Sequence, residues 1–323
     1  MEDGRAFKYT AHVSAGEPNT SHALVLELVG TGKRVLDVGC ASGYLGEALI
    51  AQGNRVSGVE IDAGAAEEAR KALDRVVVGD LDHMDLVEEF GPATFDVLVF
   101  ADVLEHLKDP VQALRRSRPL LAPGGCVVVS IPNVAHGSVR LALLQGRFEY
   151  RPLGLLDDTH LRFFTRDHFE DLLAEAGFAM VDSRQTTAGP FDTEIPVDRG
   201  DFPAEVVARV EGDPESWVYQ FVARAEPIDL PSENVAEAFA RRTAEVQQLR
   251  RALARIARLA GPDHGGPVAG VLDPGPRAED GAAGAALASL RLAVAMLELR
   301  RRLAGYTVRA YTLSHGAVLS EIG

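Results

Sequence analysis

An alternation of apolar, β-branched segments with amphipathic segments between residues 34 and 131 constrains the fold of this chain more than any other feature. Strands are predicted at 34–39, 55–62, 75–80, 95–102 and 126–132, and helices between them at 44–53, 63–73 and 110–125. Continuous Val, Ile and Leu runs separated by helices are typical of a parallel sheet that is covered on both faces. We therefore expect a doubly wound α/β domain.

Residues 133–164 interrupt this alternation with Gly, His, Arg and aromatic residues. A helix over 165–178, with a Thr cap and a glycine end, restores it. Two late strands are predicted at 179–187 and 216–225, and the Pro-, Gly- and Asp-rich residues 189–216 are expected to form a long loop between them. These two strands bring the predicted sheet to seven, mostly parallel.

The composition changes in the last third of the chain. Residues 233–260 carry apolar side chains at heptad spacing, 261–284 form a Gly/Pro linker, and 285–303 show a second apolar stripe. We therefore expect a globular domain at 1–228 and a helical, partly disordered extension at 229–323. The two helices either associate with another copy or pack on their own domain, and we favour a homo-oligomer.

The formal net charge of -14 opposes binding to nucleic acid or to an anionic membrane surface. The start of the chain lacks the basic and apolar regions of a signal peptide, and no apolar run approaches the ~20 residues of a membrane span. Cys40 and Cys126 stand in apolar, strand-like surroundings, which fits buried thiols in a reducing compartment. No metal-binding spacing is present, and we expect a cytoplasmic protein without a metal.

The segment RVLDVGCASGYLGEAL (34–49) joins the first predicted strand to a helix through a turn of small residues. Gly39 and Gly43 frame a GxxxG pattern, in which backbone atoms can approach a ligand without an intervening side chain. The pattern alone describes a tight turn without a ligand equally well. Asp37 near the end of the first strand and Glu60 at the end of the second add carboxylates, and Glu60 stands where it could accept both ribose hydroxyls.

Asp80 and Leu81 follow the third strand in VVVGDL, where they could recognise the amino group of an adenine. With these residues, the motifs FADVLEHLKDP, LLAPGGCVVVSIPN, DDTHLRFFT and LLAEAGF make residues 20–225 resemble the class I S-adenosylmethionine-dependent methyltransferases. The chain resembles most the branch that includes ubiquinone-pathway-like O-methyltransferases and enzymes of glycan and natural-product pathways. Ala41 replaces the middle glycine of the usual GxGxG. A dehydrogenase is the competing interpretation, but the VLEH…PGG signature does not belong to it.

The resemblance implies a Rossmann-like fold with S-adenosylmethionine over the turn and the neighbouring strand ends. The cofactor-binding residues that it implies are Asp37, Gly39, Cys40, Ala41, Gly43, Glu60, Ile61, Asp80, Leu81, Ala101 and Asp102. Asp37 and the turn would hold the amino-acid end, Glu60 the ribose and Asp80 the adenine. The cofactor's methionine part and sulfonium would then be what keeps the turn residues small.

A hydroxyl acceptor must lose a proton as the methyl group is transferred, so a base at the carboxyl edge of the sheet would help. Candidate bases are His106, His136 and His160. His160 is the leading candidate, because Asp157 and Asp158 just upstream could orient it and because the resembling family carries a His in a similar context. For each histidine, a hydrogen bond that only holds a loop is the alternative.

Residues 132–166 are expected to form a substrate lid that is rich in arginine and aromatic residues. The residues assigned to the substrate are Arg147, Tyr150, Asp157 and Arg162. A basic, aromatic lid on an acidic chain suggests an anionic acceptor. The alternative is that the arginines pair with the protein's own acids.

The sequence therefore predicts methyl transfer from S-adenosylmethionine to a small molecule, most simply to a hydroxyl in a specialised or glycan-related pathway. Methylation at nitrogen or carbon is an alternative in which a base matters less. The alternative from another class of protein is a non-catalytic, cofactor-binding scaffold that recruits a partner through its C-terminal helices.

Overall fold

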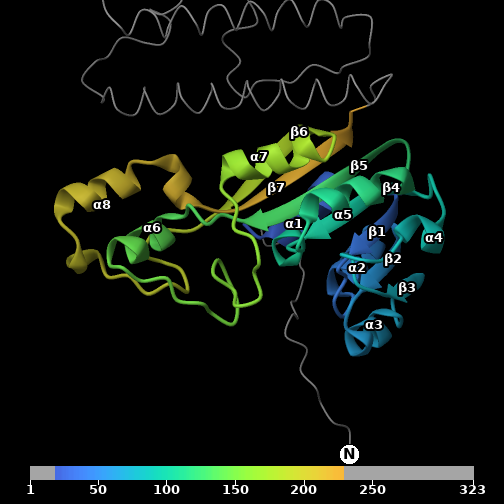
Figure 1. Cartoon of the computed structure of the whole chain (residues 1–323), viewed down its shortest axis with the longest axis horizontal. Helices are drawn as coiled ribbons and strands as arrows, with labels where there is room; N and C mark the ends of the chain where they lie inside the picture. The colour runs from blue at the N-terminus through green and yellow to red at the C-terminus, as the bar shows by residue number, and fades with distance from the viewer. Residues whose placement is uncertain (1–18, 229–323) are drawn as a thin grey trace, which may run out of the picture. The chain divides into compact units, whose positions relative to one another are not determined.

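The computed structural model describes residues 19–228, which fold around one seven-stranded sheet (Figure 1). The strands are β1 (Arg34–Val38), β2 (Arg55–Glu60), β3 (Arg75–Val78), β4 (Phe95–Ala101), β5 (Leu121–Pro132), β6 (Phe178–Thr187) and β7 (Val218–Pro227). Their order in the sheet is β3-β2-β1-β4-β5-β7-β6, and β7 is antiparallel to both of its neighbours. The sheet is therefore mixed, with six strands in one direction, which agrees with the predicted mostly parallel arrangement.

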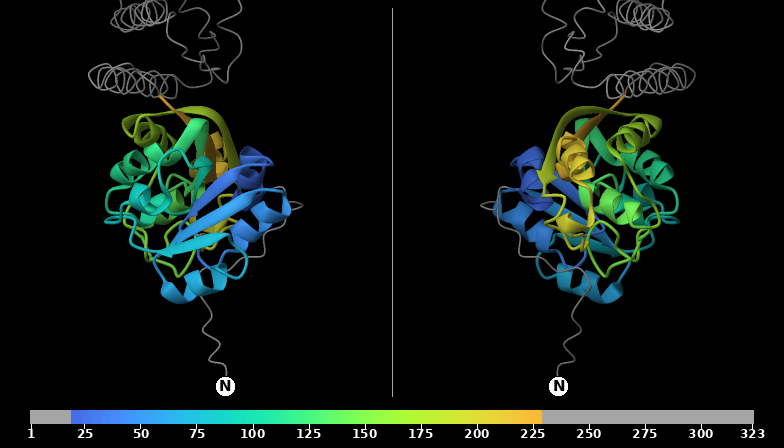
Figure 2. Two further views of the ribbon diagram at one scale, coloured as in Figure 1. Left: turned by 90° about the vertical axis from the view of Figure 1, so that its right-hand side faces the viewer. Right: turned by 90° about the vertical axis from the view of Figure 1, so that its left-hand side faces the viewer.

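Helices cover both faces of this sheet (Figure 2). They are α1 (Ser21–Val29), α2 (Tyr44–Ala51), α3 (Ala63–Ala69), α4 (Leu86–Phe90), α5 (Pro110–Ser117), α6 (Gly137–Leu144), α7 (Arg166–Glu175) and α8 (Ala204–Glu211). Helices α1, α2 and α3 pack on one face, and α4, α5 and α7 pack on the other. Successive residues of β1 serve opposite faces, Val35 the first and Leu36 the second, as the pleat of a strand requires.

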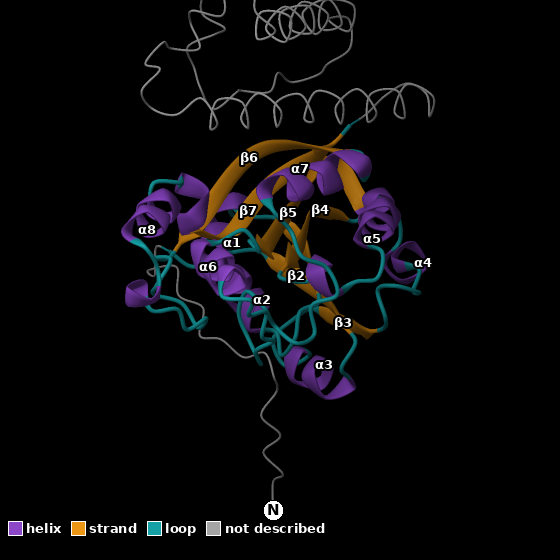
Figure 3. Cartoon of the chain, turned by 60° about the vertical axis from the view of Figure 1, so that its left-hand side comes forward, coloured by secondary structure: helices purple, strands orange, loops and turns teal. Residues whose placement is uncertain are grey.

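A third apolar cluster lies beyond the two faces and joins α6 to α8 (Figure 3). It corrects the prediction that 189–216 is a loop, because this segment contains α8 and the short 3-10 helices Arg199–Asp201 and Pro214–Trp217. Val210 of α8 is buried in this cluster, and Val206, one helical turn earlier, packs against it.

The helix predicted over 110–125 is also shorter than expected. It ends at Ser117, a 3-10 turn follows at Arg118–Leu120, and β5 already begins at Leu121. Pro119 explains the early end, because proline lacks the amide hydrogen that would continue the helix and restricts the residue before it.

The predicted heptad helices, the linker and the oligomerisation of the C-terminal extension lie outside the described residues. Within residues 19–228, no helix combines the length and the apolar character needed to cross a membrane.

Candidate active site

The turn after β1 has an unusual backbone. Gly39, Ala41 and Gly43 all have positive φ angles, of 77°, 46° and 88°. The amides of Gly39 and Cys40 both donate to the Val59 carbonyl, at 2.8 and 3.0 Å, which ties the turn to the end of β2. Left-handed backbone favours glycine, so the two glycines are needed here for conformation alone.

The small size of the turn residues is also required by the protein's own packing. A Cβ on Gly39 would lie 2.6 Å from a Val103 methyl carbon, and one on Gly43 would lie 3.0 Å from the Ala69 Cα. Cys40 is 2% exposed and belongs to the core between the sheet and α1–α3. Conformation and packing thus account for the two glycines without a ligand, and the cofactor as the reason for the small turn residues stays a prediction. Cys40 has only its backbone to offer a ligand.

Glu60 at the end of β2 is held by two backbone amides. Its Oε2 accepts from the Ala41 amide at 2.9 Å, and its Oε1 accepts from the Asp62 amide at 2.8 Å. Each carboxylate oxygen retains a lone pair, since an ionised carboxylate can accept about four hydrogen bonds. The carboxylate is thus oriented in advance beside the turn, as the binding of a ribose diol would require.

Asp80 and Leu81 follow β3 near Ile61. The Asp80 carboxylate accepts from the Asp82 amide at 2.9 Å and lies 2.8 Å from His83 Nδ1, contacts that lower the Asp80 pKa. Leu81 is partly buried against the core, whereas Ile61 is 67% exposed. An exposed isoleucine at a strand end fits the apolar face of a base.

Asp37 is a buried carboxylate without a compensating charge. It is 2% exposed, and its Oδ2 has no hydrogen-bond partner within the described structure. Burial, and then the neighbouring Glu60 carboxylate, raise the pKa of Asp37 to about 7. A buried carboxyl of this kind is suited to a cationic ligand group, such as the ammonium of an amino acid.

Ala101 and Asp102 end β4 on the same edge of the sheet. Asp102 has a φ angle of 54°, and its amide donates to the Ser130 carbonyl at 3.2 Å. Its carboxylate accepts from Gln220 Nε2 at 2.9 Å and from Ser21 Oγ at 3.4 Å. Strands β4, β5 and β7 and the start of α1 thus converge on this one side chain.

Glu105 is a second buried carboxylate, three residues further on. It is 1% exposed, and neither of its carboxylate oxygens has a hydrogen-bond partner among the described residues. Burial raises the Glu105 pKa well above its usual range. Its Oε1 lies 3.9 Å from Nε2 of His160, while its backbone carbonyl accepts from the amides of Leu161 and Arg162. The carbonyl thus attaches the His160 loop to the end of β4.

His106 and His160 lie together beside this carboxylate. Their ring centroids are 4.8 Å apart, and His106 Nδ1 lies 3.1 Å from Thr159 Oγ1. Asp157 is buried and accepts from Thr159, so it shapes the loop rather than facing solvent. Glu105, His106 and His160 also offer possible metal-ligand atoms within 4.8 Å of one another, although the sequence predicts no metal.

A row of aromatic rings leads from His160 to the surface. His160 packs edge-on against Phe163 at 6.1 Å between centroids, and Phe163 against Phe148 at 5.6 Å. Tyr150 packs against Phe148 at 5.7 Å and is 55% exposed, whereas His160 is 8% exposed. The expected lid therefore contains an aromatic wall that runs from solvent to a buried histidine.

The lid arginines donate to groups of the protein itself. Arg147 donates to the Pro196 carbonyl at 2.7 Å, and Arg162 to the Lys108 carbonyl at 2.6 Å. Three further arginines of the segment form ion pairs with carboxylates: Arg140–Asp213, Arg151–Glu149 and Arg166–Glu215. These contacts match the alternative in which the arginines are used internally, and none of them supports an anionic acceptor.

His136 has a structural position. It is fully buried, and its Nε2 lies 3.0 Å from the Ala188 carbonyl while its Nδ1 lies 2.9 Å from Ser138 Oγ. Both ring nitrogens are therefore engaged at the start of α6, and burial lowers the His136 pKa. We do not retain His136 as a base.

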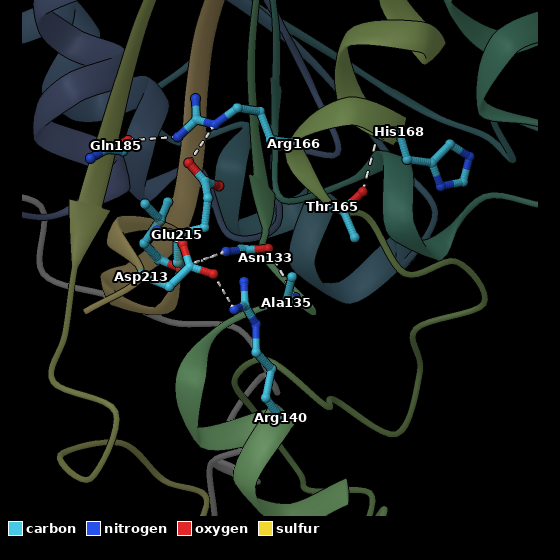
Figure 4. A network of polar contacts seen from close by, with 10 residues as sticks. Asn133, Ala135, Arg140, Thr165, Arg166, His168, Gln185, Asp213 and Glu215 are labelled. Carbon is cyan, nitrogen blue, oxygen red and sulfur yellow. Dashed lines mark hydrogen bonds and ion pairs between the residues drawn. The ribbon is translucent and has the colours of Figure 1, made fainter. Parts of the chain in front are cut away.

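A polar network joins the lid to the late strands (Figure 4). The Asn133 side chain donates to the Glu215 carbonyl at 3.3 Å, and Arg140 of α6 pairs with Asp213 at 2.6 Å. Arg166 at the start of α7 pairs with the Glu215 carboxylate at 2.8 Å. Side chains from distant parts of the chain thus connect α6 and the start of α7 to the segment before β7.

This geometry agrees with comparisons to known proteins. A family model described as a methyltransferase domain matches residues 17–183, just over half of the chain. A ubiquinone biosynthesis O-methyltransferase of Psychrobacter arcticus is 30% identical over 176 residues, which cover 53% of this chain and 68% of that protein. Its namesake from Ruegeria pomeroyi is 31% identical over 162 residues, covering 49% of this chain and 65% of that protein.

The solved structures that resemble the chain include an S-adenosylmethionine-dependent methyltransferase of Thermotoga maritima. It is 21% identical, covers 64% of this chain and 87% of its own, and has a TM-score of 0.45. The family match shows that the chain belongs to the class I S-adenosylmethionine-dependent methyltransferases, and S-adenosylmethionine is its cofactor. The chain is thus an enzyme that transfers a methyl group.

Two residues of this site were not identified from the sequence. Glu105 stands in VLEHL beside the candidate His106. It could have been recognised as a carboxylate inside an otherwise apolar segment, which indicates a buried acid. Gln220 had no such signal, because only the antiparallel pairing of β7 with β5 brings it to Asp102.

Proposed function

We propose that this enzyme methylates a hydroxyl oxygen of a small molecule, with the acceptor held between the Gly39–Gly43 turn and the pair Glu105–His160. The observation that carries the proposal is the buried Glu105 carboxylate, which has no hydrogen-bond partner within residues 19–228 and lies 3.9 Å from His160 Nε2. A buried carboxylate beside an imidazole is suited to hold a histidine that accepts a proton.

The cofactor end of the proposal depends on three carboxyl groups. Asp37 would pair with the ammonium of the cofactor, because no group in the described part of the chain bonds to its buried Oδ2. Glu60 would accept the ribose hydroxyls, since two backbone amides already orient it. Asp80, with the exposed face of Ile61, would hold the adenine. S-adenosylmethionine supplies the electrophilic methyl group on its sulfonium.

On the acceptor side, His160 would remove the hydroxyl proton as the oxygen forms its bond to the methyl carbon. The resulting imidazolium would be stabilised by the Glu105 carboxylate, and the proton would pass to solvent after the product leaves. Methylation of nitrogen or carbon has less need of this pair, so the His160 variant also tests that alternative.

The aromatic wall supports an acceptor with a flat, apolar part. Phe148, Tyr150 and Phe163 present ring faces and edges next to His160, and aromatic pairs of this kind contribute about 0.5–1.5 kcal/mol beyond burial. The named function of the relatives, O-methylation in ubiquinone biosynthesis, involves an acceptor compatible with such a wall. A specialised or glycan-related pathway and an anionic acceptor stay predictions from the sequence.

The test is the substitution His160→Ala, with transfer of labelled methyl groups from S-adenosylmethionine to catechols as the assay. Turnover should fall by about 10²–10⁴-fold, the usual range for one general base, while cofactor affinity measured by calorimetry stays within about twofold. The control is His168→Ala, an exposed histidine on α7. Near-normal turnover of His160→Ala would show that His160 is not the general base.

A further inference from the structure

Asp102 is held in a conformation that L-residues rarely adopt. Its φ angle of 54° lies in the left-handed region, which Asp and Asn tolerate better than other residues with a side chain but which still carries some strain. The strain is maintained by hydrogen bonds from its amide to Ser130 and from Gln220 and Ser21 to its carboxylate. Strain that surrounding contacts maintain is often found at functional sites.

The carboxylate of Asp102 lies where the cofactor and acceptor regions meet. Its charge helps to raise the pKa of Tyr44, the first residue of α2 after the turn, although burial is the larger cause. The same charge contributes to the raised pKa of Glu105 on the acceptor side. Strand β4 pairs with β1, with Val99 opposite Asp37, so Asp102 follows the end of β4 next to the turn after β1 and precedes Glu105 by three residues.

The described contacts of Asp102 leave its negative charge largely uncompensated. Gln220 and Ser21 are neutral donors, and no lysine or arginine is among its described partners. The two imidazoles whose charge would favour an ionised Asp102 are those of His22 and His106, and burial lowers the pKa of His22 and so favours its neutral form. Burial also raises the pKa of Asp102, so ionising it without a nearby cation is unfavourable.

We propose that Asp102 recognises the positive charge of the cofactor's sulfonium and thereby distinguishes S-adenosylmethionine from the demethylated product. The inference rests on the proposed position of the cofactor over the Gly39–Gly43 turn. The methyl group must face the acceptor, so the sulfonium must lie between the turn and the Glu105–His160 pair, which is the junction where Asp102 is held.

The two forms of the cofactor make this selection possible. Both carry the same adenosine, ammonium and carboxylate, and they differ by one methyl group and one positive charge at sulfur. Transfer of the methyl group leaves a neutral thioether, so the attraction to Asp102 disappears with the reaction. Asp102 then favours binding of the reactive form and release of the spent one.

The experiment compares three ligands by calorimetry: S-adenosylmethionine, sinefungin and S-adenosylhomocysteine. Sinefungin carries an ammonium near the position of the sulfonium, whereas S-adenosylhomocysteine is neutral there. Asp102→Asn should weaken the two cationic ligands by at least about tenfold and the neutral ligand by less than about threefold. Asn is chosen because it tolerates left-handed backbone better than most residues.

Asp37→Asn is the matched control, because all three ligands carry the ammonium that Asp37 is proposed to bind. This variant should weaken all three by a similar factor. Asp102→Gly, which removes the carboxylate and relieves the strain, should reproduce the selective loss if the charge is responsible.

Equal weakening of all three ligands by both Asp102 variants would overturn charge recognition and leave the cofactor position intact. If neither Asp37→Asn nor either Asp102 variant changes the affinity for any of the three ligands, the proposed cofactor position is wrong as well.

Discussion

The proposed cofactor side and the proposed acceptor side of this site are built in different ways. The cofactor side is made within residues 34–81 by consecutive strands and the turn after β1, and its shape is fixed by backbone conformation. The acceptor side combines residues 104–164 with 185–220 through side-chain contacts such as Arg140–Asp213. Local backbone geometry leaves little freedom for substitution, whereas side-chain contacts can be exchanged without changing the sheet. The comparison explains how one cofactor scaffold can serve different acceptors.

The largest effect is expected from a substitution that breaks the backbone of the cofactor side. Gly43→Val adds branched atoms where a Cβ already lies 3.0 Å from the Ala69 Cα, at a φ angle of 88°. Strain and overpacking together should lower the free energy of unfolding by about 4–6 kcal/mol. Chemical denaturation would measure this loss.

Gly53→Ala is the control for that experiment. Gly53 has a φ angle of 94°, but nothing lies within 4 Å of the added Cβ. Only conformational strain of about 1–2 kcal/mol is expected there. Equal losses in the two variants would mean that close packing of the turn against α3 is unimportant.

The next effect concerns the uncompensated charge of Asp37. Its pKa of about 7 in the folded protein is above the ordinary value of 3.8 for an aspartate, so the folded state binds this proton more tightly. The resulting stabilisation is complete below about pH 4 and is lost as the pH rises to about 7. As the pH rises from 4 to 8, the unfolding free energy of Asp37→Asn minus that of wild type should therefore increase by up to about 4 kcal/mol.

Denaturation of both proteins across that pH range, without cofactor, measures the difference. Other buried acids contribute to both proteins and largely cancel. A difference that stays constant from pH 4 to pH 8 would show that Asp37 is not a buried, uncompensated group.

The smallest effect is expected on the acceptor side, at Arg162. Its side chain is exposed and donates to the Lys108 carbonyl at 2.6 Å, so it already has a partner. Arg162→Ala should change the KM for a neutral phenolic acceptor by less than about twofold, as for surface contacts in general. A tenfold rise in the KM for a phenol that also carries a carboxylate, diminishing at high salt, would restore the anionic acceptor predicted from the sequence.

The same difference between the two sides decided what could be predicted from sequence. The strands could be predicted because buried parallel strands are continuous β-branched runs. Asp37, Glu60 and Asp80 were selected as candidates because each stands at or near the end of such a run. Helix α8 was missed because Val207 and Val210 stand in a segment rich in Pro, Gly and Asp.

The acceptor side was less predictable for a physical reason. The pairing of Glu105 with His160 depends on a loop that returns to the end of β4, which no local pattern encodes. The arginines were recognised as a basic group, but their partners, including the Pro196 and Lys108 carbonyls, come from other segments. Charge can be counted in a sequence, but whether it is already neutralised depends on tertiary contacts.

The single antiparallel strand has a consequence for protein engineering. Because β7 runs against β5, with Gln220 opposite Pro132 and Ala225 opposite Val127, its last residue lies at the edge of the sheet opposite Asp102. Asn19, by contrast, bonds to Thr187 at the end of β6, on the catalytic edge. A purification tag or fluorescent protein joined directly after Pro227 would therefore depart from the far edge, whereas one joined directly before Asn19 would start at the edge that carries Asp102.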